Sequence, residues 1–239
     1  VVLTGIHLSS YGRDLGGDTL MDAIRAVAAV PGVRRIRLGS LEPVVATEAF
    51  VNELARIPQL CPQFHLSMQS GSDSVLRRMR RRYTAAEYLA AARRLQAAFP
   101  GCALTTDVLC GFPGETEEEA AQTLAFCREV GFARMHVFPF SAREGTEAAR
   151  MPGQLTRAVK NERAQALIAL GEALAQHYRQ TLVGTVQEVL FETEEPHGAV
   201  GLTPQYVEAY APGARGGQIA RVQLDCVHGQ RLIGRLLPE

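Results

Sequence analysis

The sequence lacks closely spaced cysteines, long apolar runs and an excess of charge of either sign. No run approaches the roughly 18 apolar residues that cross a membrane, and no signal-peptide pattern is present. The five cysteines include no CxxC pair and lie far apart in the chain: Cys61, Cys102, Cys110, Cys127 and Cys226. An odd, scattered set of thiols without a signal peptide predicts reduced cysteines, a cytoplasmic location and no association with a membrane.

The 25 basic residues balance 25 acidic ones, which gives no overall electrostatic reason to expect a nucleic acid as partner. The charge is unevenly distributed, because residues 183–239 hold four arginines against seven acidic residues, a net charge of −3. Lys160 is the only lysine. It falls in a predicted helix rather than at a strand end, so the sequence argues against a Schiff-base lyase or aldolase.

The 239 residues suffice for one large domain or for one domain with a small appendage, and an apolar content of 46% is ample for a core. The chain has no initiating methionine and opens inside a predicted strand, Val1–Thr4. We therefore expect it to be a piece of a longer protein.

Short apolar runs alternate with helical patterns in the first part of the chain, which is typical of βα units and a parallel sheet. The predicted strands are Val1–Thr4, Arg34–Leu38, Phe64–Met68, Ala103–Leu109 and Arg134–Phe138. The predicted helices are Thr19–Val30, Glu48–Ile57, Asp73–Met79, Ala85–Phe99 and Glu117–Val130. Capping boxes at Thr84 and Thr116 mark two helix starts, and Gly131 marks a helix end.

A long amphipathic stretch, Thr156–Leu182, leads out of the α/β region. After Gly184 the pattern changes to short alternating runs separated by Gly and Pro, which is typical of a small all-β barrel of OB-like size. We predict three parts: residues 1–155 with five βα strands of a barrel, residues 156–183 as a connecting helix, and residues 184–239 as a β-barrel domain.

Residue alternation gives each predicted strand one apolar and one polar face. In the third strand, Leu66 and Met68 alternate with His65, Ser67 and Gln69. The same alternation places further polar residues on one face: Arg35, Arg37, Thr105, Asp107 and His136. Ordinary (β/α)8 barrels fill their interior with branched apolar side chains. The polar face therefore predicts a wide or open barrel that holds a large polar ligand, although any single member has the alternative of a hydrogen-bonded core residue.

Five motifs in order carry a resemblance to a known family, and they read LTGIHLSSYG, RLGSLEP, HLSMQSGSDSVLRRMRRRYT, TTDVLCGFPGET and HVFPFSAREGT. With these motifs the chain resembles the radical S-adenosylmethionine (SAM) methylthiotransferases from Val1 to its end. Its terminal β domain resembles their TRAM RNA-binding domain. The stretches Gly5–His7 and Ser40–Pro43 make it most similar to the branch that modifies threonylcarbamoyladenosine in tRNA.

The resemblance implies an α/β fold with a partial (β/α)6-type radical SAM barrel, represented here by five βα strands, followed by a small all-β, OB-like TRAM domain. It implies S-adenosyl-L-methionine as cofactor and two 4Fe–4S clusters in the full-length protein. The first strand of such enzymes ends in CxxxCxxC, a motif that this sequence does not contain. We therefore expect no catalytic residue and no metal ligand in this chain, cluster ligands outside it, and no activity of the chain alone.

The resemblance also implies which residues hold SAM. Ser67 and Gln69 match the ribose-binding strand end, and Arg81 matches the arginine that pairs with the methionine carboxylate. The full expected set is Gly5, His7, Glu42, Ser67, Gln69, Arg81, Asp107, Gly111 and Pro139. For His7 the alternative is an ordinary loop histidine, and for Glu42 an exposed turn residue. The expected RNA contacts are four arginines of the terminal domain: Arg215, Arg221, Arg231 and Arg235.

The implied function is transfer of a methylthio group to C2 of threonylcarbamoyladenosine next to the anticodon, by radical SAM chemistry. The implied partners are tRNA and an electron donor that reduces the cluster, and we expect a monomer. Two alternatives within the family are modification of isopentenyladenosine in tRNA and of an aspartate in a ribosomal protein. An alternative of another class is a non-catalytic RNA-binding protein, although the net negative charge of residues 183–239 argues against a broad phosphate-binding face.

Overall fold

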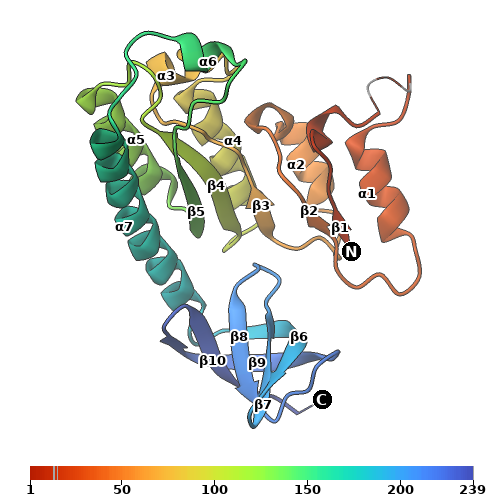
Figure 1. The fold of residues 1–239 in the computed structure, drawn as a ribbon. Coiled ribbons are helices and arrows are strands. Elements are labelled where there is room, and N and C mark those ends of the chain that lie inside the picture. Colours follow the sequence, from red (N-terminus) through yellow and green to blue (C-terminus); the bar gives the residue numbers. More distant parts are fainter. Residues whose placement is uncertain (13, 15, 239) are drawn as a thin grey trace.

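The computed structural model describes residues 1–12, 14 and 16–238. An α/β part occupies the top of Figure 1 and a small β-barrel lies below it, and the long helix α7 (Arg157–Leu182) runs from one to the other. Among the described residues, no helix has both the length and the apolar character that a membrane span requires.

Parallel strands form the sheet of the α/β part in the order of the sequence (Figure 1). β1 pairs with β2, and β4 lies between β3 and β5. Single parallel bridges, Ile36 to Leu60 and Leu41 to Leu66, join the two groups. The strands are β1 (Val2–Leu3), β2 (Arg37–Leu38), β3 (Gln63–His65), β4 (Ala103–Cys110) and β5 (Arg134–Pro139). This arrangement confirms the predicted α/β partial barrel.

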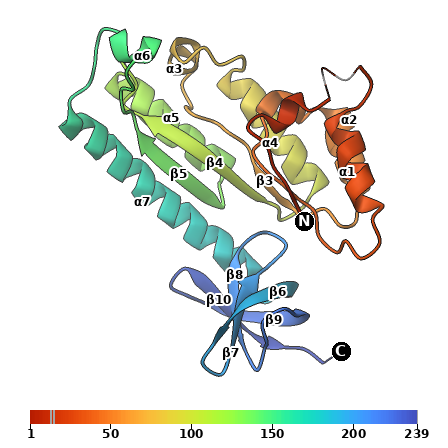
Figure 2. The same cartoon turned by 45° about the vertical axis from the view of Figure 1, so that its right-hand side comes forward.

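Helices connect the strands, and α1, α2, α4, α5 and α7 form a layer in which each contacts the next (Figure 2). The helices before α7 are α1 (Leu20–Ala28), α2 (Glu48–Leu54), α3 (Asp73–Arg78), α4 (Ala85–Ala98), α5 (Glu117–Val130) and α6 (Glu147–Arg150). Short 3-10 turns at Leu8–Ser10 and Pro43–Val45 follow β1 and β2. Each of the two loops at the carboxyl ends of β1 and β2 therefore contains a helical turn.

The helix boundaries follow local capping signals. The predicted capping boxes at Thr84 and Thr116 are confirmed, since each hydroxyl accepts a backbone N–H and the third helical residue reaches back. A further capping box joins Thr19 to Asp22. The Ser/Thr-x-x-Glu pattern did not predict it, because Asp takes the place of Glu. Gly131 ends α5 with a φ of 74°, as predicted.

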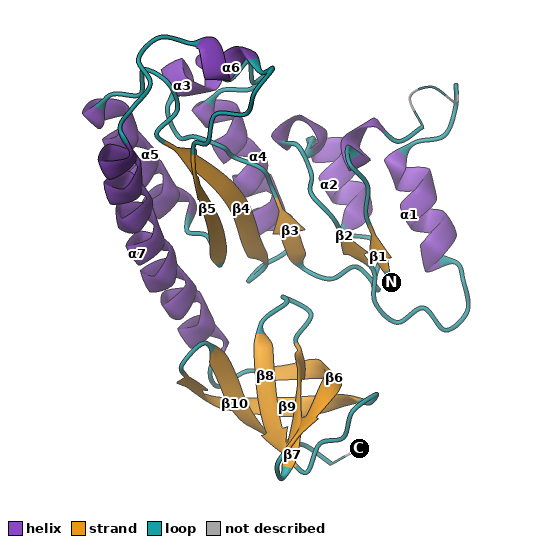
Figure 3. Cartoon of the chain, in the orientation of Figure 1, coloured by secondary structure: helices purple, strands orange, loops and turns teal. Residues whose placement is uncertain are grey.

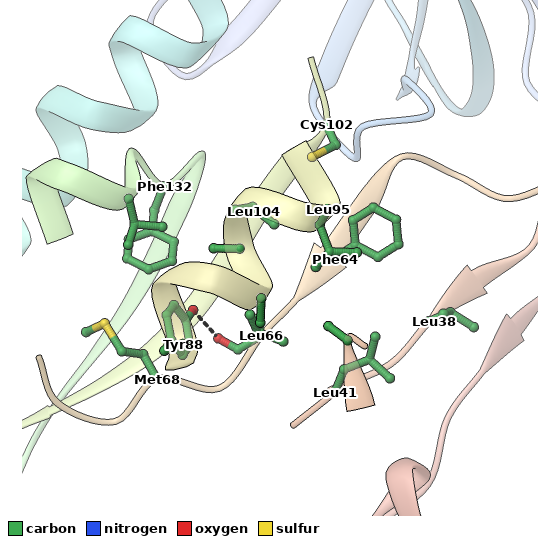
Figure 4. Close-up of a cluster of buried hydrophobic side chains, with 14 of the residues drawn as sticks. Leu38, Leu41, Phe64, Leu66, Met68, Tyr88, Leu95, Cys102, Leu104 and Phe132 are labelled. Carbon is green, nitrogen blue, oxygen red and sulfur yellow. Dashed lines mark hydrogen bonds between the residues drawn. The ribbon is translucent and has the colours of Figure 1, made fainter. Parts of the chain in front are cut away.

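The apolar face of the sheet is buried beneath the helices (Figure 4). Leu66, Met68 and Tyr88 are fully buried, and the Tyr88 hydroxyl donates to the Leu66 carbonyl oxygen at 2.7 Å. His65 and Ser67, which alternate with them, stay partly exposed on the opposite face. The observed alternation confirms one apolar and one polar face for this strand.

A closed β-barrel forms the lower part of the molecule (Figure 3), with the strand order β10-β8-β7-β6-β9. The strands are β6 (Val186–Glu195), β7 (Gly198–Leu202), β8 (Glu208–Pro212), β9 (Ile219–His228) and β10 (Arg231–Leu236). Its core is separate from that of the α/β part and contains Val189, Phe191, Val222, Leu224 and Leu232. The predicted small all-β barrel is confirmed. We call this part the β-domain.

The second and third strands are shorter than predicted. Ladder pairing covers only Arg37–Leu38 instead of Arg34–Leu38, and Gln63–His65 instead of Phe64–Met68. The reason is the weak connection between β2 and β3, which pair only through isolated bridges. The chain continues in extended form beyond β3, because the N–H of Leu66 still donates to the Thr105 carbonyl oxygen at 2.9 Å.

Arg35 and Arg37 were predicted to lie on the polar face of the sheet. In the structure both of them also contact the β-domain. The guanidinium of Arg35 donates to the carbonyl oxygens of Leu202 at 3.0 Å and Glu188 at 2.7 Å. The guanidinium of Arg37 lies 4.2 Å from the centre of the Tyr206 ring. These contacts hold the β-domain beneath the amino-terminal ends of the strands.

Candidate functional site

The candidate site lies at the carboxyl ends of the parallel strands and on the polar face beside them. Partial and complete α/β barrels bind ligands at this end, because the strand-to-helix loops converge there. The predicted cofactor residues fall in the loops after β1 and β2, in the segment after β3, in or just after β4, and at the end of β5. Arg81 lies further along, between α3 and α4.

His65, Asp107 and His136 form a polar cluster on neighbouring strands. Nε2 of His65 lies 3.4 Å from Oδ2 of Asp107, and the His65 and His136 rings are 6.2 Å apart between centres. Nδ1 of His65 lies 3.1 Å from the hydroxyl oxygen of Thr105. The geometry at Nε2 does not make a hydrogen bond, so among the described residues this buried nitrogen has a carboxylate nearby but no hydrogen-bond partner.

The electrostatic environment keeps His136 neutral more readily than a free histidine. Burial, and then the positive charge of Arg134, lower the pKa of His136 below its ordinary value of 6.5. The carboxylate of Asp107 acts in the opposite direction but does not outweigh them. A neutral imidazole at pH 7 has one donor and one acceptor nitrogen for a polar ligand.

Gln69 occupies an uncommon backbone conformation at the end of the third strand. Its φ is 68°, in the left-handed region that few residues other than glycine adopt. Two backbone hydrogen bonds hold this conformation. The N–H of Gln69 donates to the Asp107 carbonyl oxygen at 2.9 Å, and the Gln69 carbonyl oxygen accepts from the Leu109 N–H at 2.8 Å. Such outliers gather at functional sites, and this one turns the chain at the predicted ribose-binding position.

Tyr83 clamps the segment that contains Ser67. Its hydroxyl donates to the carbonyl oxygens of Ser67 and Met68, both at 3.0 Å. Burial raises the pKa of Tyr83 to about 12, so the hydroxyl stays a donor at all physiological pH values. Arg81, the predicted carboxylate partner, is exposed. Its positive charge lowers the pKa of Tyr83 but does not outweigh the effect of burial. Arg81 and Ser67 therefore flank the same tyrosine.

The loops after β1 and β2 meet through His7 and Glu42. Nε2 of His7 lies 3.0 Å from Oε2 of Glu42, and the backbone N–H of Glu42 donates to the Ser9 hydroxyl oxygen at 3.1 Å. Gly5 is exposed, and a Cβ placed on it would contact nothing within 4 Å. His7 and Glu42 thus form a pair, and Gly5 lies on the open surface beside them.

Gly111 and Pro139 lie at the ends of β4 and β5. A Cβ on Gly111 would approach Cγ of Lys160 to 2.6 Å, and its φ is 72°. Its N–H donates to the Glu115 carboxylate at 3.1 Å. The side of Gly111 that would carry a Cβ therefore faces α7. This close approach is a structural reason for a glycine at this position, separate from its predicted adenine contact. Pro139 is exposed and pairs in register with Cys110.

The predicted RNA-binding arginines differ in how free their charges are. Arg231 pairs with Glu195 at 2.9 Å and Glu208 at 2.8 Å, and Arg235 pairs with Asp225 at 2.6 Å. Arg215 and Arg221 are exposed. These ion pairs partly neutralise Arg231 and Arg235, so the two side chains should attract a phosphate less strongly than the sequence alone indicated.

The cysteines do not fit an iron–sulfur cluster. The described residues contain no group of three or more His, Cys, Asp or Glu side chains placed to hold a metal ion. Burial raises the pKa of Cys102 and Cys127 to about 12 and that of Cys110 to about 11, whereas a cluster needs thiolates. We derive no step of a reaction through a cluster from these residues.

SAM itself fits the polar face better. The Nε2 atom of His65, which lacks a hydrogen bond within the described part of the chain, the strained backbone of Gln69 and the His7–Glu42 pair all lie on its inner side or at its carboxyl-end loops. They offer donors and acceptors of the kind that ribose hydroxyls and an amino acid group require. His65, His136 and Tyr83 were not among the predicted site residues, although strand alternation had already placed the two histidines on the polar face.

An open, parallel βα half-barrel with polar groups on its inner face and at its carboxyl end defines a ligand-binding α/β barrel. Comparison with known proteins gives the family: the sequence model described as the radical SAM superfamily matches residues 3–127. The chain belongs to the radical SAM superfamily.

Two curated relatives match most of the chain. One is the threonylcarbamoyladenosine tRNA methylthiotransferase MtaB of Bacillus subtilis, 40% identical over 94% of this chain and 51% of the relative. The other is the tRNA-2-methylthio-N(6)-dimethylallyladenosine synthase of Acidothermus cellulolyticus, 39% identical over 93% of this chain and 46% of the relative. The chain thus spans about half the length of the curated relatives it matches.

A solved structure supports the fold. The radical SAM enzyme coproporphyrinogen III oxidase (HemN) of Escherichia coli superposes with a TM-score of 0.52 at 16% identity, over 86% of this chain and 50% of the other. At this identity the likeness shows the fold alone.

Proposed function

We propose that this chain is the SAM-binding and RNA-binding portion of a tRNA methylthiotransferase that modifies C2 of threonylcarbamoyladenosine next to the anticodon. The observation that carries the proposal is the joint match of fold and sequence. A radical SAM partial barrel with a polar inner face continues into a β-barrel, and a relative named as a threonylcarbamoyladenosine tRNA methylthiotransferase aligns with 94% of the chain.

The proposed role of the polar face is to bind and orient SAM. Ser67 and Gln69 would hold the ribose, Arg81 the carboxylate, and the segment from Asp107 to Gly111 the adenine, with Pro139 beside it. Gly5, His7 and Glu42 would complete the set at the methionine end. In this superfamily SAM supplies radical chemistry when it is bound to a reduced iron–sulfur cluster, and we propose two such clusters with ligands outside this chain.

The proposed partners follow from the substrate. tRNA would contact the β-domain, which we propose as a separate TRAM-like domain at residues 184–239, joined through residues 156–183 to a barrel domain at residues 1–155. An electron donor would reduce the cluster of a monomeric protein. The proposed tRNA substrate supports a cytoplasmic location.

Nucleoside analysis of tRNA tests the proposed substrate. In a strain that lacks the gene, we expect 2-methylthio-threonylcarbamoyladenosine to disappear and its unmethylthiolated precursor to accumulate, and the full-length gene should restore it. Loss of the methylthiolated isopentenyladenosine instead would establish the alternative that the Acidothermus relative represents. If every methylthiolated nucleoside and the ribosomal proteins stay unchanged, the enzymatic proposal is wrong.

A further inference from the structure

A pocket of about 540 Å³ lies where the α/β part meets the β-domain. It is distinct from the candidate site, because it opens at the amino-terminal ends of β4 and β5 rather than at their carboxyl ends. Helix α7 and the turn between β7 and β8 complete its walls. Its lining residues include Arg134, Arg179, Gln205 and Tyr206.

Two of these residues have polar atoms that their surroundings do not satisfy. Nε of Arg179 and Oε1 of Gln205 are buried and have no hydrogen-bond partner within the described part of the chain. Buried polar atoms are nearly always paired, because leaving them unpaired is costly. One is a donor and the other an acceptor, and both belong to residues that line this pocket. This combination indicates a ligand that has both kinds of polar group.

Tyr206 presents an aromatic ring to the same pocket. It is 49% exposed, although the guanidinium of Arg37 lies 4.2 Å from the ring centre. Its φ is 66°, an uncommon value for an aromatic residue. The turn holds this conformation, since the N–H of Tyr206 donates to the Thr203 carbonyl at 3.0 Å and Thr203 is fully buried. A strained backbone that exposes a ring is typical of a binding residue.

Charged groups of both signs line the pocket. Arg134 and Arg179 line it on the side of the α/β part. Two acidic residues also lie in the wall: Glu208, whose carboxylate lies 2.8 Å from Nε of Arg231, and Glu172, on exposed α7 surface. Arg231 also pairs with Glu195, so it offsets the charge of Glu208 only in part. An extended, highly charged backbone would need more basic groups than these, but one phosphate would not.

We propose that this junction pocket binds one nucleotide of a single-stranded RNA segment. The base stacks on Tyr206, its polar edge meets Gln205, and the phosphate lies near Arg179 and Arg134. Stacking on an aromatic ring beside a few basic groups is how proteins hold single-stranded nucleotides. The proposal rests on the proposed function in taking RNA as the substrate, and it adds a second contact site at the end of the barrel opposite the SAM residues.

Fluorescence anisotropy of a fluorescein-labelled, mixed-sequence RNA of ten nucleotides tests the pocket with the full chain. Tyr206→Asn removes the ring but keeps a residue that tolerates positive φ, and Arg179→Gln removes a charge. Each should weaken RNA binding about tenfold. The matched controls are His197→Asn, an exposed ring residue with a φ of 67° in the β6–β7 turn, and Arg56→Gln, an exposed arginine in the turn after α2. Both controls should bind like the unmodified chain.

Equal affinities for all variants, or no binding of this RNA by the unmodified chain, would overturn the pocket. A second measurement does not depend on variants: RNA with 4-thiouridine should cross-link, under ultraviolet light, to the peptide that contains Gln205 and Tyr206. Cross-links confined to other peptides would also overturn it. The tRNA nucleoside analysis tests the proposed function separately. If tRNA nucleosides are unchanged but Tyr206→Asn weakens RNA binding, only the proposed function is refuted. If the methylthiolated nucleoside is lost but Tyr206→Asn binds RNA normally, only the proposed nucleotide site is refuted.

Discussion

Arg78 and Glu119 form a bidentate ion pair, in which Nη1 of Arg78 lies 3.0 Å from Oε1 of Glu119 and Nη2 lies 2.6 Å from Oε2. Arg78 ends α3, the helix that follows the segment containing Gln69, whereas Glu119 lies in the first turn of α5. Ser74 also donates to the Glu119 carboxylate. One carboxylate therefore anchors the chain after the candidate site to the helix that follows β4.

Glu119→Gln tests this anchor through its pH dependence. The Arg78 guanidinium, more than any other group, lowers the pKa of Glu119 to about 2 from an ordinary 4.5. Its stabilisation is therefore fully present above pH 4.5 and is lost as the pH falls toward 2. We expect the variant to lose about 1–2 kcal/mol of unfolding free energy at pH 7, a value reduced for screening at the part-exposed Arg78. Urea unfolding from pH 7 to pH 2 measures it.

The control is Glu118→Gln, which neutralises an exposed carboxylate in the same helical turn. It should change the unfolding free energy by only a few tenths of a kcal/mol at either pH. A loss in Glu119→Gln that stays constant down to pH 2 would contradict the ion-pair explanation.

Arg163→Met tests the buried pair between Glu115 and Arg163, whose closest atoms are 2.8 Å apart. The Glu115 side chain is 3% exposed, so removing its partner leaves an uncompensated buried charge at a cost of about 3–5 kcal/mol. The double variant Glu115→Gln with Arg163→Met should lose less than Arg163→Met alone, because it removes that charge. Urea unfolding at pH 7 compares them, and a double variant that is the less stable of the two would refute the argument.

Gly111→Ala separates the approach of α7 from the cost of positive φ. Gly111 and Gly131 have φ values of 72° and 74°, but only at Gly111 would a Cβ collide with another residue, Lys160 at 2.6 Å. Gly131→Ala should therefore cost about 1–2 kcal/mol, and Gly111→Ala distinctly more. Thermal unfolding followed by circular dichroism compares the two variants. Equal losses would show that the flexible Lys160 side chain gives way.

Local signals made most of the fold predictable. The helix Glu117–Val130 was predicted at its observed bounds, because the capping box at Thr116 and the terminal Gly131 act within a few residues. Strand alternation likewise placed His65 and Asp107 on one face, where they lie 3.4 Å apart between nearest side-chain atoms. The part of the candidate site that depends on this alternation was therefore accessible from the sequence.

Contacts between distant segments were not predictable in this way. Nothing near Arg35 in the sequence indicates that its guanidinium binds the carbonyl oxygens of the β-domain, and nothing near Gly111 indicates that Lys160 packs on it. The charges of Arg231 and Arg235 are offset by Glu195, Glu208 and Asp225. Residue counts cannot show such pairing, because it depends on the register of the barrel strands.

The pKa of His136 should respond to its two charged neighbours in opposite ways. Arg134→Gln should raise that pKa and Asp107→Asn should lower it, because Arg134 disfavours the imidazolium and Asp107 favours it. Since the folded pKa lies below 6.5, this histidine contributes stability above pH 6.5 that is lost as the pH falls through the folded pKa. Proton NMR titration of the histidine ring measures the shifts. Identical titration curves for the three proteins would contradict the environment described for His136.

Gln69→Gly tests the SAM site without disturbing the backbone that forms it. Glycine adopts the φ of 68° without strain, so the turn after β3 should persist while the amide side chain is lost. We expect the reconstituted full-length protein to bind SAM roughly 2- to 10-fold more weakly, the effect of one lost hydrogen bond. The control is His197→Gly, which makes the same change at a φ of 67° in the β-domain. Equilibrium dialysis with labelled SAM measures both variants, and equal affinity of Gln69→Gly and His197→Gly would remove Gln69 from the site.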